Sequence, residues 1–75
     1  MIWKSIEDET PVAYESGNWD GLRSEEVLVS DKEGVLHVAR MYEGTMDGSH
    51  FRDFYDNRDF DIKDVTHWCK IPMLF

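Results

Sequence analysis

The sequence has one cysteine, Cys69, only two prolines, and no long apolar run. A single cysteine excludes an internal disulfide, and a lone thiol is typical of a reducing compartment. No stretch approaches the roughly 18 consecutive apolar residues of a membrane-spanning helix, and "MIWKSIEDET" lacks the apolar segment of a signal peptide. We therefore expect a cytoplasmic protein that makes no membrane contact.

Cations are also scarce. Eight Lys and Arg residues stand against sixteen Asp and Glu residues, which gives a formal net charge of −8. Binding to a phosphate backbone needs the opposite sign, so direct nucleic-acid binding is not expected. An acidic balance is typical of plain solubility, of a surface that meets a basic partner, or of a mimic of nucleic-acid charge.

The length of 75 residues predicts one domain, 1–75. A chain this short buries only about 60% of the surface that its unfolded form exposes. Three Trp, three Tyr and four Phe compensate in part, because each aromatic side chain can remove about 150–250 Å² from water. Aromatic packing is therefore expected to stabilise the core.

The clearest structural signal is an antiparallel hairpin in "VLVSDKEGVLHVARMY", residues 27–42. Two runs rich in β-branched residues flank "SDKEG", in which Asp31 suits the start of a turn and Gly34 suits a positive φ. Alternation in the second run predicts two faces, the first made of Val35, His37, Ala39 and Met41, and the second of Leu36, Val38, Arg40 and Tyr42.

Two further strands are expected. The first covers about residues 51–55, with Phe51 and Tyr55 on the face opposite Phe54, and a turn follows at residues 56–59. The second is the alternating run "DVTHWCKI", residues 64–71. It places Val65, His67, Cys69 and Ile71 on one face, and Thr66, Trp68 and Lys70 on the other.

The remaining segments are expected to be irregular. Trp3 and Ile6 indicate a single helical turn or an arm laid on the core, and the glycines and serines of residues 13–24 predict a loop. Its aromatics, Tyr14 and Trp19, either fold back onto the core or are presented to a partner. The predicted fold class is β-rich, α+β at most: a small antiparallel sheet of three to four strands, arranged as a meander with long loops.

A pattern along the whole chain resembles the small phage and prophage proteins grouped as domain of unknown function 551. That family carries an early Trp and Pro, a "VLV" strand, a strand ending in Ala-Arg-Tyr, and a closing Val-Thr-His-Trp. The matching residues are Trp3, Pro11, Val27, Leu28, Val29, Val38, Ala39, Arg40, Tyr42, Val65, Thr66, His67, Trp68, Ile71 and Pro72. Lys70 departs from it, standing where the family tends to have proline. The resemblance implies a phage or prophage accessory protein and assigns no reaction.

Catalytic and metal chemistry have little support. His67 and Cys69 can point the same way from one strand, but structural zinc sites normally have paired ligands on both sides. The aspartates of residues 53–64 fit no EF-hand register, and the glycines form no phosphate-binding motif. Cys69 beside His67 is a weak nucleophile–base pair. We expect no enzyme activity, no catalytic residue, no metal and no cofactor.

Two candidate binding sites remain. The first is an acidic and aromatic ridge for a protein partner, because aromatics ringed by charge are frequent binding hot spots. It comprises Asp53, Phe54, Tyr55, Asp56, Asp59, Phe60 and Asp61, with Trp19. The second is a small-ligand pocket made of Arg40, Tyr42, His67 and Trp68, since arginine among aromatics can hold a phosphate or stack on a ring. For Arg40 an intramolecular carboxylate partner is the simpler expectation.

We hypothesise that the protein is a non-enzymatic phage or prophage accessory protein. It would bind and inhibit a host protein, such as a defence component, in the cytoplasm of an infected or lysogenic bacterium. Two alternatives stay open: a protein that binds or sequesters a nucleotide-like small molecule, and a mimic of nucleic-acid charge. Self-association into a homo-oligomer and an assembly role are also left open.

Overall fold

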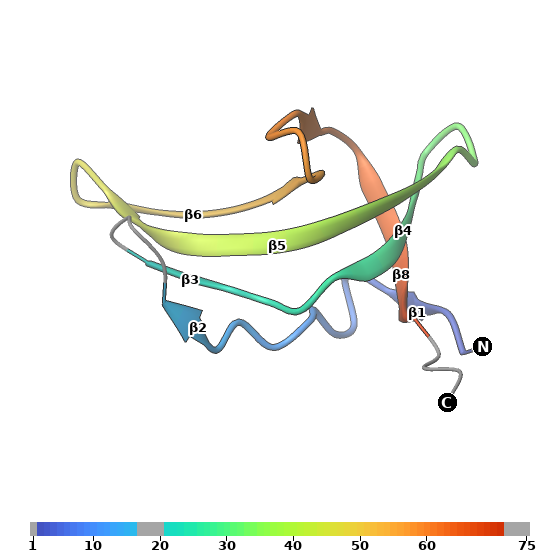
Figure 1. Ribbon diagram of the computed structural model, residues 1–75, viewed down its shortest axis with the longest axis horizontal. Coiled ribbons are helices and arrows are strands. Elements are labelled where there is room, and N and C mark those ends of the chain that lie inside the picture. The colour runs from blue at the N-terminus through green and yellow to red at the C-terminus, as the bar shows by residue number, and fades with distance from the viewer. Residues whose placement is uncertain (1, 17–20, 72–75) are drawn as a thin grey trace.

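The computed structural model describes residues 2–16 and 21–71, and within them the chain forms strands and no helix (Figure 1). The β-rich expectation is confirmed. The strands are β1 (Lys4–Ser5), β2 (Glu15–Ser16), β3 (Gly21–Arg23), β4 (Val27–Asp31), β5 (Leu36–Met46), β6 (Ser49–Tyr55), β7 (Asp61–Ile62) and β8 (Val65–Lys70). The four expected strands are present as β4, β5, β6 and β8, and four short strands extend the sheet.

All strand pairs are antiparallel, in the order β1-β8-β4-β5-β3-β2, with β6 on the other edge of β5 and β7 beyond β6. The four longest strands therefore lie in the order β8-β4-β5-β6. Three hairpin-connected strands followed by a fourth that returns beside the first form a Greek key. The expected meander is wrong, because β8 pairs with β4 and not with β6.

Strands β3 and β4 share one edge of β5 and are separated by a bulge. Arg23 lies opposite Tyr42 and Val27 opposite Ala39, so residues 24–26 oppose only residues 40–41, and one residue is extra. Ser24 closes this gap. Its backbone N–H donates to the carbonyl of Met41 at 2.8 Å, and its buried hydroxyl accepts the N–H of Met41 at 2.9 Å. Strand β5 curves along its length past this point (Figure 1).

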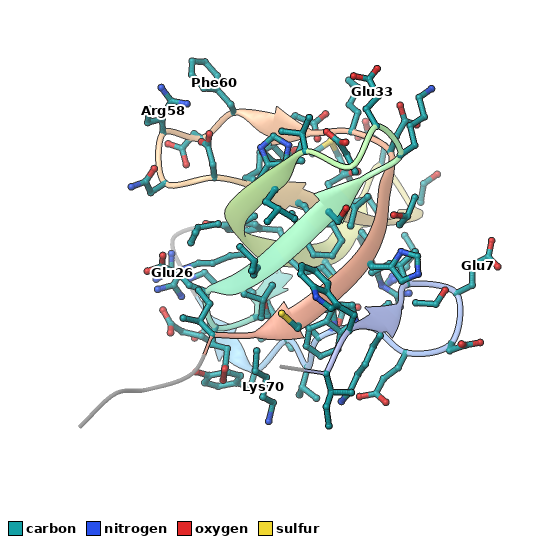
Figure 2. All side chains as sticks on the ribbon, turned by 90° about the vertical axis from the view of Figure 1, so that its right-hand side faces the viewer. Glu7, Glu26, Glu33, Arg58, Phe60 and Lys70 are labelled. Carbon is teal, nitrogen blue, oxygen red and sulfur yellow. The ribbon has the colours of Figure 1, made fainter. Side chains whose placement is uncertain are left out.

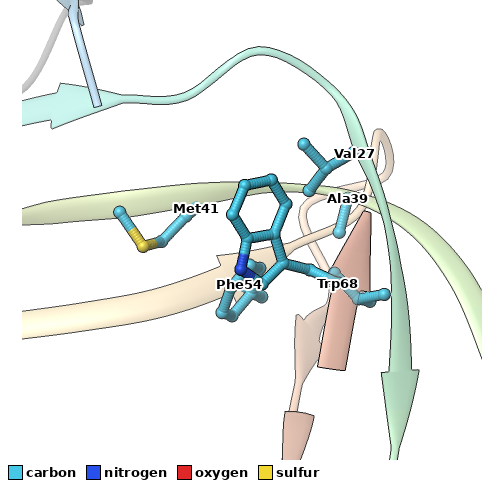
Figure 3. Close-up of a cluster of buried hydrophobic side chains, with 6 residues drawn as sticks. Val27, Ala39, Met41, Phe54 and Trp68 are labelled. Carbon is cyan, nitrogen blue, oxygen red and sulfur yellow. The ribbon is translucent and has the colours of Figure 1, made fainter. Parts of the chain in front are cut away.

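The core lies on one face of this curved sheet, which we call the inner face. Its buried side chains are Val27, Val29, Ala39, Met41, Phe54 and Trp68 (Figure 3). Trp68 enters from β8 and donates its indole N–H to the carbonyl of Glu9 at 2.8 Å. This bond ties the N-terminal segment over the core, where Ile6 and Ala13 add apolar contacts. As expected, aromatic side chains contribute to the core, and among the described residues these are Trp68 and Phe54.

The opposite face of the sheet is the outer face. In β5, Ala39 and Met41 are buried whereas Leu36 and Val38 are 55% and 46% exposed, so the predicted alternation is confirmed. In β8, Trp68 points to the inner face, as its burial among core residues shows. Cys69 lies opposite Leu28 and is also buried. The predicted opposite orientation of Trp68 and Cys69 is therefore confirmed. Val65 was predicted on the face of Cys69, and this is wrong: it packs against the inner core, next to a register shift between Ser30 and Asp31.

Two segments form more strand than the sequence predicts, although the N-terminal segment lies on the core as expected. The N-terminal arm is an edge strand, β1, which pairs with β8 and is followed by a turn in which Asp8 and Glu9 both donate to the carbonyl of Ser5. The expected loop at residues 13–24 contains β2 and β3, which pair with each other and, through β3, with β5. Both segments become strands because they pair with the edges of neighbouring strands. Their local composition does not predict this pairing.

The β5–β6 and β4–β5 turns have the backbone conformations that their residue types favour. Asp47 and Gly48 have φ values of 52° and 81°, the two positive values that a two-residue hairpin turn of type I′ requires. In the β4–β5 turn, Gly34 has a φ of 82° and Asp31 accepts the N–H groups of Glu33 and Val35. The predicted roles of Asp31 and Gly34 are both confirmed.

Candidate partner-binding surface

The outer face of β5 and β6 carries three half-buried aromatic side chains, Tyr42, Phe51 and Tyr55. Tyr42 of β5 lies opposite Asp53 of β6, while Phe51 and Tyr55 lie two residues to either side of Asp53. Diagonal neighbours of this kind are within reach of aromatic side chains. Tyr42 and Tyr55 are in contact, with ring centroids 5.3 Å apart and an interplanar angle of 86°. Two perpendicular rings thus form adjoining walls.

These rings surround a cavity of about 250 Å³ that is open to solvent, which we call the aromatic hollow. Its lining residues are Tyr42, Met46, Phe51, Tyr55 and Asp59. Met46 is 65% exposed, and the cross-strand neighbour of Phe51 is Gly44, which has no side chain to place on this face. The hollow is therefore apolar on its walls, with one carboxylate at its edge.

The register that builds the hollow comes from the Asp47-Gly48 turn. Because only two residues connect β5 to β6, Met46 must lie opposite Ser49, and each further pair follows in order. Phe51 consequently lies opposite Gly44, and Tyr55 opposite Arg40. A shift of one residue would move Phe51 and Tyr55 to the inner face. The turn therefore decides which aromatics are presented.

A polar network borders the hollow on the side of β3. Arg23 donates through Nε to Oε1 of Glu15 at 2.8 Å, and a second Arg23 nitrogen contacts the same oxygen. This hydrogen bond lowers the pKa of Glu15, and it raises the pKa of Arg23 together with a hydrogen bond to Tyr42. Arg40 lies 3.7 Å from Glu15 and 3.8 Å from Glu26. The two arginines are thus each balanced by carboxylates.

Carboxylates also flank the Tyr55 hydroxyl. Burial is the main cause that raises the pKa of Tyr55, followed by the charges of Asp53 and Asp61. Asp61 forms an ion pair with Lys63 at 3.0 Å, and this contact raises the pKa of Lys63, with Asp53 and Asp64 adding to the shift. Lys63 therefore sits near three aspartates, of which Asp53 alone makes no ion pair among the described residues.

A larger cavity of about 470 Å³ lies between the β4–β5 turn and the segment from residue 56 to residue 64. Figure 2 shows Glu33 on one of these loops and Arg58 and Phe60 on the other. Each of the four basic side chains that line it is paired with a carboxylate. The pairs are His37–Asp31 at 3.1 Å, Lys32–Asp64 at 3.4 Å, Arg58–Asp56 at 3.4 Å and Lys63–Asp61 at 3.0 Å. This cavity therefore offers a phosphate group no unpaired cation from the described residues.

Two of the carboxylates that line this cavity, Asp31 and Asp56, have a lowered pKa and are poorly suited to proton transfer near neutral pH. The hydrogen bond to His37 is the main cause that lowers the pKa of Asp31. The backbone N–H of Phe60 is the main cause that lowers the pKa of Asp56. A general acid or base works best when its pKa lies near the working pH, and both shifts move away from neutrality.

The distribution of charge is uneven across the described residues. Every Lys and Arg except Lys70 is within 4.0 Å of a carboxylate. Seven described carboxylates make no ion pair at that distance: Glu7, Asp8, Glu25, Glu33, Asp47, Asp53 and Asp59. Glu7 and Glu33 extend from separate edges of the molecule in Figure 2. The excess negative charge is therefore available to an external cation.

The predicted ridge is only partly assembled. Tyr55 and Asp59 line the aromatic hollow, Asp53 lies between Phe51 and Tyr55 on β6, and Asp61 is the cross-strand neighbour of Tyr55. Phe60 is 59% exposed, with Arg58 stacked 5.0 Å from its ring centroid.

Two ridge residues need correction, and a third lies outside the described residues. Phe54 is 6% exposed because it faces the opposite side of β6 and packs in the core. Asp56 uses one carboxylate oxygen to accept the backbone N–H groups of Arg58 and Phe60, so it is mainly a turn residue. Trp19 falls within residues 17–20, outside the described residues.

The predicted small-ligand pocket is not formed as proposed. Arg40 and Tyr42 do line a common cavity of about 250 Å³, together with Arg23 and Tyr55. Trp68 is buried on the inner face, and the exposed His67 lies on β8, which is separated from β5 by β4. The predicted intramolecular carboxylate partner of Arg40 is present as two glutamates, Glu15 and Glu26.

Sequence reasoning missed Met46, Phe51 and Arg23 as parts of this surface. The signal that could have found the first two is the Asp47-Gly48 dipeptide, which is a strong indicator of a two-residue hairpin turn. It fixes which β5 residues face which β6 residues. Arg23 had no local signal, because its position beside Tyr42 depends on β3 pairing with β5.

Among the described residues, no group of three or more His, Cys, Asp or Glu side chains is placed to hold a metal ion. His67 contacts the hydroxyl of Thr66 at 3.0 Å through Nδ1. Nor do those residues form a helix with the length and apolar character to cross a membrane. Comparison with protein-family models, curated proteins and solved structures finds no match to this chain.

Proposed function

We propose that this protein is a non-enzymatic binding protein that docks on a basic surface of another protein through its outer face. The observation that carries the proposal is the aromatic hollow of Tyr42, Met46, Phe51, Tyr55 and Asp59, set in a negative surface. Aromatic side chains surrounded by polar groups supply most of the binding energy at many protein interfaces. The resemblance to phage and prophage proteins suggests that the partner is a host protein, which binding would inhibit.

The charge distribution supports a basic partner. Because nearly all Lys and Arg side chains are paired internally, much of the net charge of −8 comes from the seven carboxylates that make no ion pair among the described residues. Complementary charge steers association and discriminates against acidic competitors. The aromatic hollow then supplies affinity that salt does not screen, since apolar burial does not depend on ionic attraction.

A nucleotide-like ligand is less well supported. Arg23 and Arg40 line a cavity with Tyr42 and Tyr55, but Glu15 and Glu26 already hold both guanidinium groups. A phosphate would have to displace these carboxylates within a negative field, which costs more than binding at an unpaired arginine. We therefore prefer a protein partner over an anionic small molecule.

Capture of proteins from a bacterial host lysate, at low and at moderate salt, tests the proposal. The bait is the full chain, compared with a Met46→Ser, Tyr55→Ser double variant and with a Val12→Ser control. Val12 is 76% exposed and does not line the hollow. We expect one dominant basic protein that the wild type and the control retain at moderate salt and the double variant loses.

Two results would count against the proposal. Capture of the same protein by the double variant at undiminished yield would show that the outer face is not the interface. Capture only at low salt, with displacement by DNA, would instead support a mimic of nucleic-acid charge, whose contacts are mainly electrostatic.

A further inference from the structure

The aromatic hollow has the features of a site for an organic cation. Two tyrosine rings at 86° to each other, together with Phe51, present π faces or edges around one open space. The face of an aromatic ring is electron-rich and attracts a guanidinium or ammonium group. Met46 adds a polarisable apolar wall that can adapt to the stem of a long side chain.

Asp59 supplies the matching anion. It lines both the hollow and the neighbouring cavity of Arg23 and Arg40, and its carboxylate makes no ion pair among the described residues. Its backbone has a φ of 63°, which is uncommon for a residue with a side chain. An acidic side chain is thus held at the edge of an aromatic site.

The nearest cations do not cancel this preference. Arg23 donates a hydrogen bond to Glu15, and Arg40 lies 3.7 Å from Glu15 and 3.8 Å from Glu26. The charges of these two arginines and two glutamates therefore cancel. Lys63 is likewise paired with Asp61. Asp53 and Asp59 remain in excess beside the hollow, which favours a positive ligand over a negative one.

We propose that the aromatic hollow receives an arginine side chain of the basic partner, stacked on the Tyr55 or Tyr42 ring and paired with the carboxylate of Asp59. This inference rests on the proposed function, which it makes specific. Arginine fits better than lysine because its planar guanidinium can stack on a ring and present two parallel N–H groups to a carboxylate. The stem of the side chain would cover Met46 and Phe51.

The direct test titrates the isotope-labelled full chain with a short glycine-spaced peptide that contains three arginines, followed by NMR. Two matched peptides replace arginine with lysine or with citrulline, which keeps the planar shape and removes the charge. We expect the arginine peptide to shift the amide signals of Met46, Phe51, Tyr55 and Asp59. The citrulline peptide should bind at least about fivefold more weakly, because it loses a cation–π contact and an ion pair.

A pair of variants of equal charge separates local binding from general attraction. Asp59→Asn removes the carboxylate and keeps a residue type that tolerates a positive φ, while Glu33→Gln removes one charge at another loop tip. Asp59→Asn should weaken the arginine peptide about two- to fivefold, and Glu33→Gln should weaken it less. Equal effects of the two variants, equal binding of citrulline or lysine, or signal shifts outside the hollow would overturn the inference.

Lysate capture with the same variants separates the two proposals. If the Met46→Ser, Tyr55→Ser variant loses the captured protein and Asp59→Asn retains it fully, the outer face is the interface and the arginine assignment fails. If the arginine peptide binds in an Asp59-dependent way but both variants capture the same proteins as the wild type, the arginine site stands and the proposed function fails.

Discussion

Two five-residue loops of this protein share one pattern of backbone hydrogen bonds but differ in the residue that adopts a positive φ. They span residues 31–35, between β4 and β5, and residues 56–60, between β6 and β7. In each loop the first residue is aspartate, whose N–H donates to the carbonyl of the fifth residue, at 3.1 Å and 3.0 Å. The fourth residue donates back to the first at 3.0 Å in both.

The side chain of the leading aspartate completes the same pattern twice. Oδ1 of Asp31 accepts the N–H groups of Glu33 at 2.9 Å and Val35 at 3.0 Å. Oδ1 of Asp56 accepts those of Arg58 at 2.8 Å and Phe60 at 3.0 Å. Aspartate is favoured at such turns because its carboxylate satisfies backbone donors two and four residues ahead. Two stretches of different sequence thus adopt one conformation.

The difference lies in the fourth residue, which has a positive φ in both loops. It is Gly34 at 82° in the first and Asp59 at 63° in the second. Glycine adopts this conformation without steric cost, whereas a residue with a Cβ is strained there. The second loop therefore carries a small conformational cost and, in return, places a carboxylate at the aromatic hollow. One hydrogen-bond pattern can thus serve stability in one loop and surface chemistry in the other.

The largest effect is expected from the leading aspartates. Asp31→Ala and Asp56→Ala each remove the acceptor of two backbone N–H groups, so both should lower the midpoint of thermal unfolding. Asp31→Ala should lower it more, because Oδ2 of Asp31 contacts the partly buried His37 at 3.1 Å, whereas Oδ2 of Asp56 contacts the exposed Arg58 at 3.4 Å. Thermal unfolding followed by circular dichroism measures the order. If Asp56→Ala lowered the midpoint of thermal unfolding as much as Asp31→Ala or more, the contact with His37 would not add to the stability of the first loop.

Substitutions at the fourth residue of the two loops should change the free energy of unfolding in opposite directions, by less than the loss of the leading aspartate. Gly34→Ala should cost about 1 kcal/mol of unfolding free energy. The added Cβ meets no atom within 4 Å, so the cost is conformational only. Asp59→Gly should stabilise the fold by about 0.5–1 kcal/mol, because it relieves the same strain. Urea unfolding of both variants is the measurement, and loss of stability in Asp59→Gly would contradict the comparison.

Asp59→Gly also links stability to binding. The same variant that gains stability should lose affinity for an arginine peptide, since it no longer has the carboxylate at the hollow. A stabilised variant with unchanged peptide affinity would show that Asp59 is only a loop residue.

The smallest effect concerns the pH dependence of the two loops. Because the folded pKa of Asp31 lies below its usual value of 3.8, its ionised form stabilises the fold above that pH. This stability is lost as the pH falls through the folded pKa. The same sign holds for Asp56. His37→Gln should raise the folded pKa of Asp31, whose main perturbing contact it removes, and leave that of Asp56 unchanged.

Carboxyl carbon chemical shifts, followed by NMR titration below pH 5, resolve both groups. A parallel shift of Asp31 and Asp56 in His37→Gln would show a long-range cause in place of the His37 contact. An unchanged Asp31 would mean that its backbone N–H bonds to Val35 and Glu33 dominate.

The sequence by itself determined the local features of this fold. Alternation predicted the two faces of β5 and the opposite orientation of Trp68 and Cys69 in β8, and Asp31 and Gly34 predicted the first hairpin turn. These features depend on residues close together in the chain, whose conformational preferences are nearly independent of the surroundings. The acidic surface was likewise readable from composition.

Tertiary structure alone decided which elements are neighbours. It placed β8 beside β4, turned residues 21–23 into a strand against β5, and put Trp68 and Arg40 on opposite faces of the sheet. Such pairings are set by the burial of apolar surface across long chain separations, and no local preference encodes them. The aromatic hollow depends on both levels: a local turn sets the register of Phe51 and Tyr55, and the loop after β6 brings Asp59 to its edge.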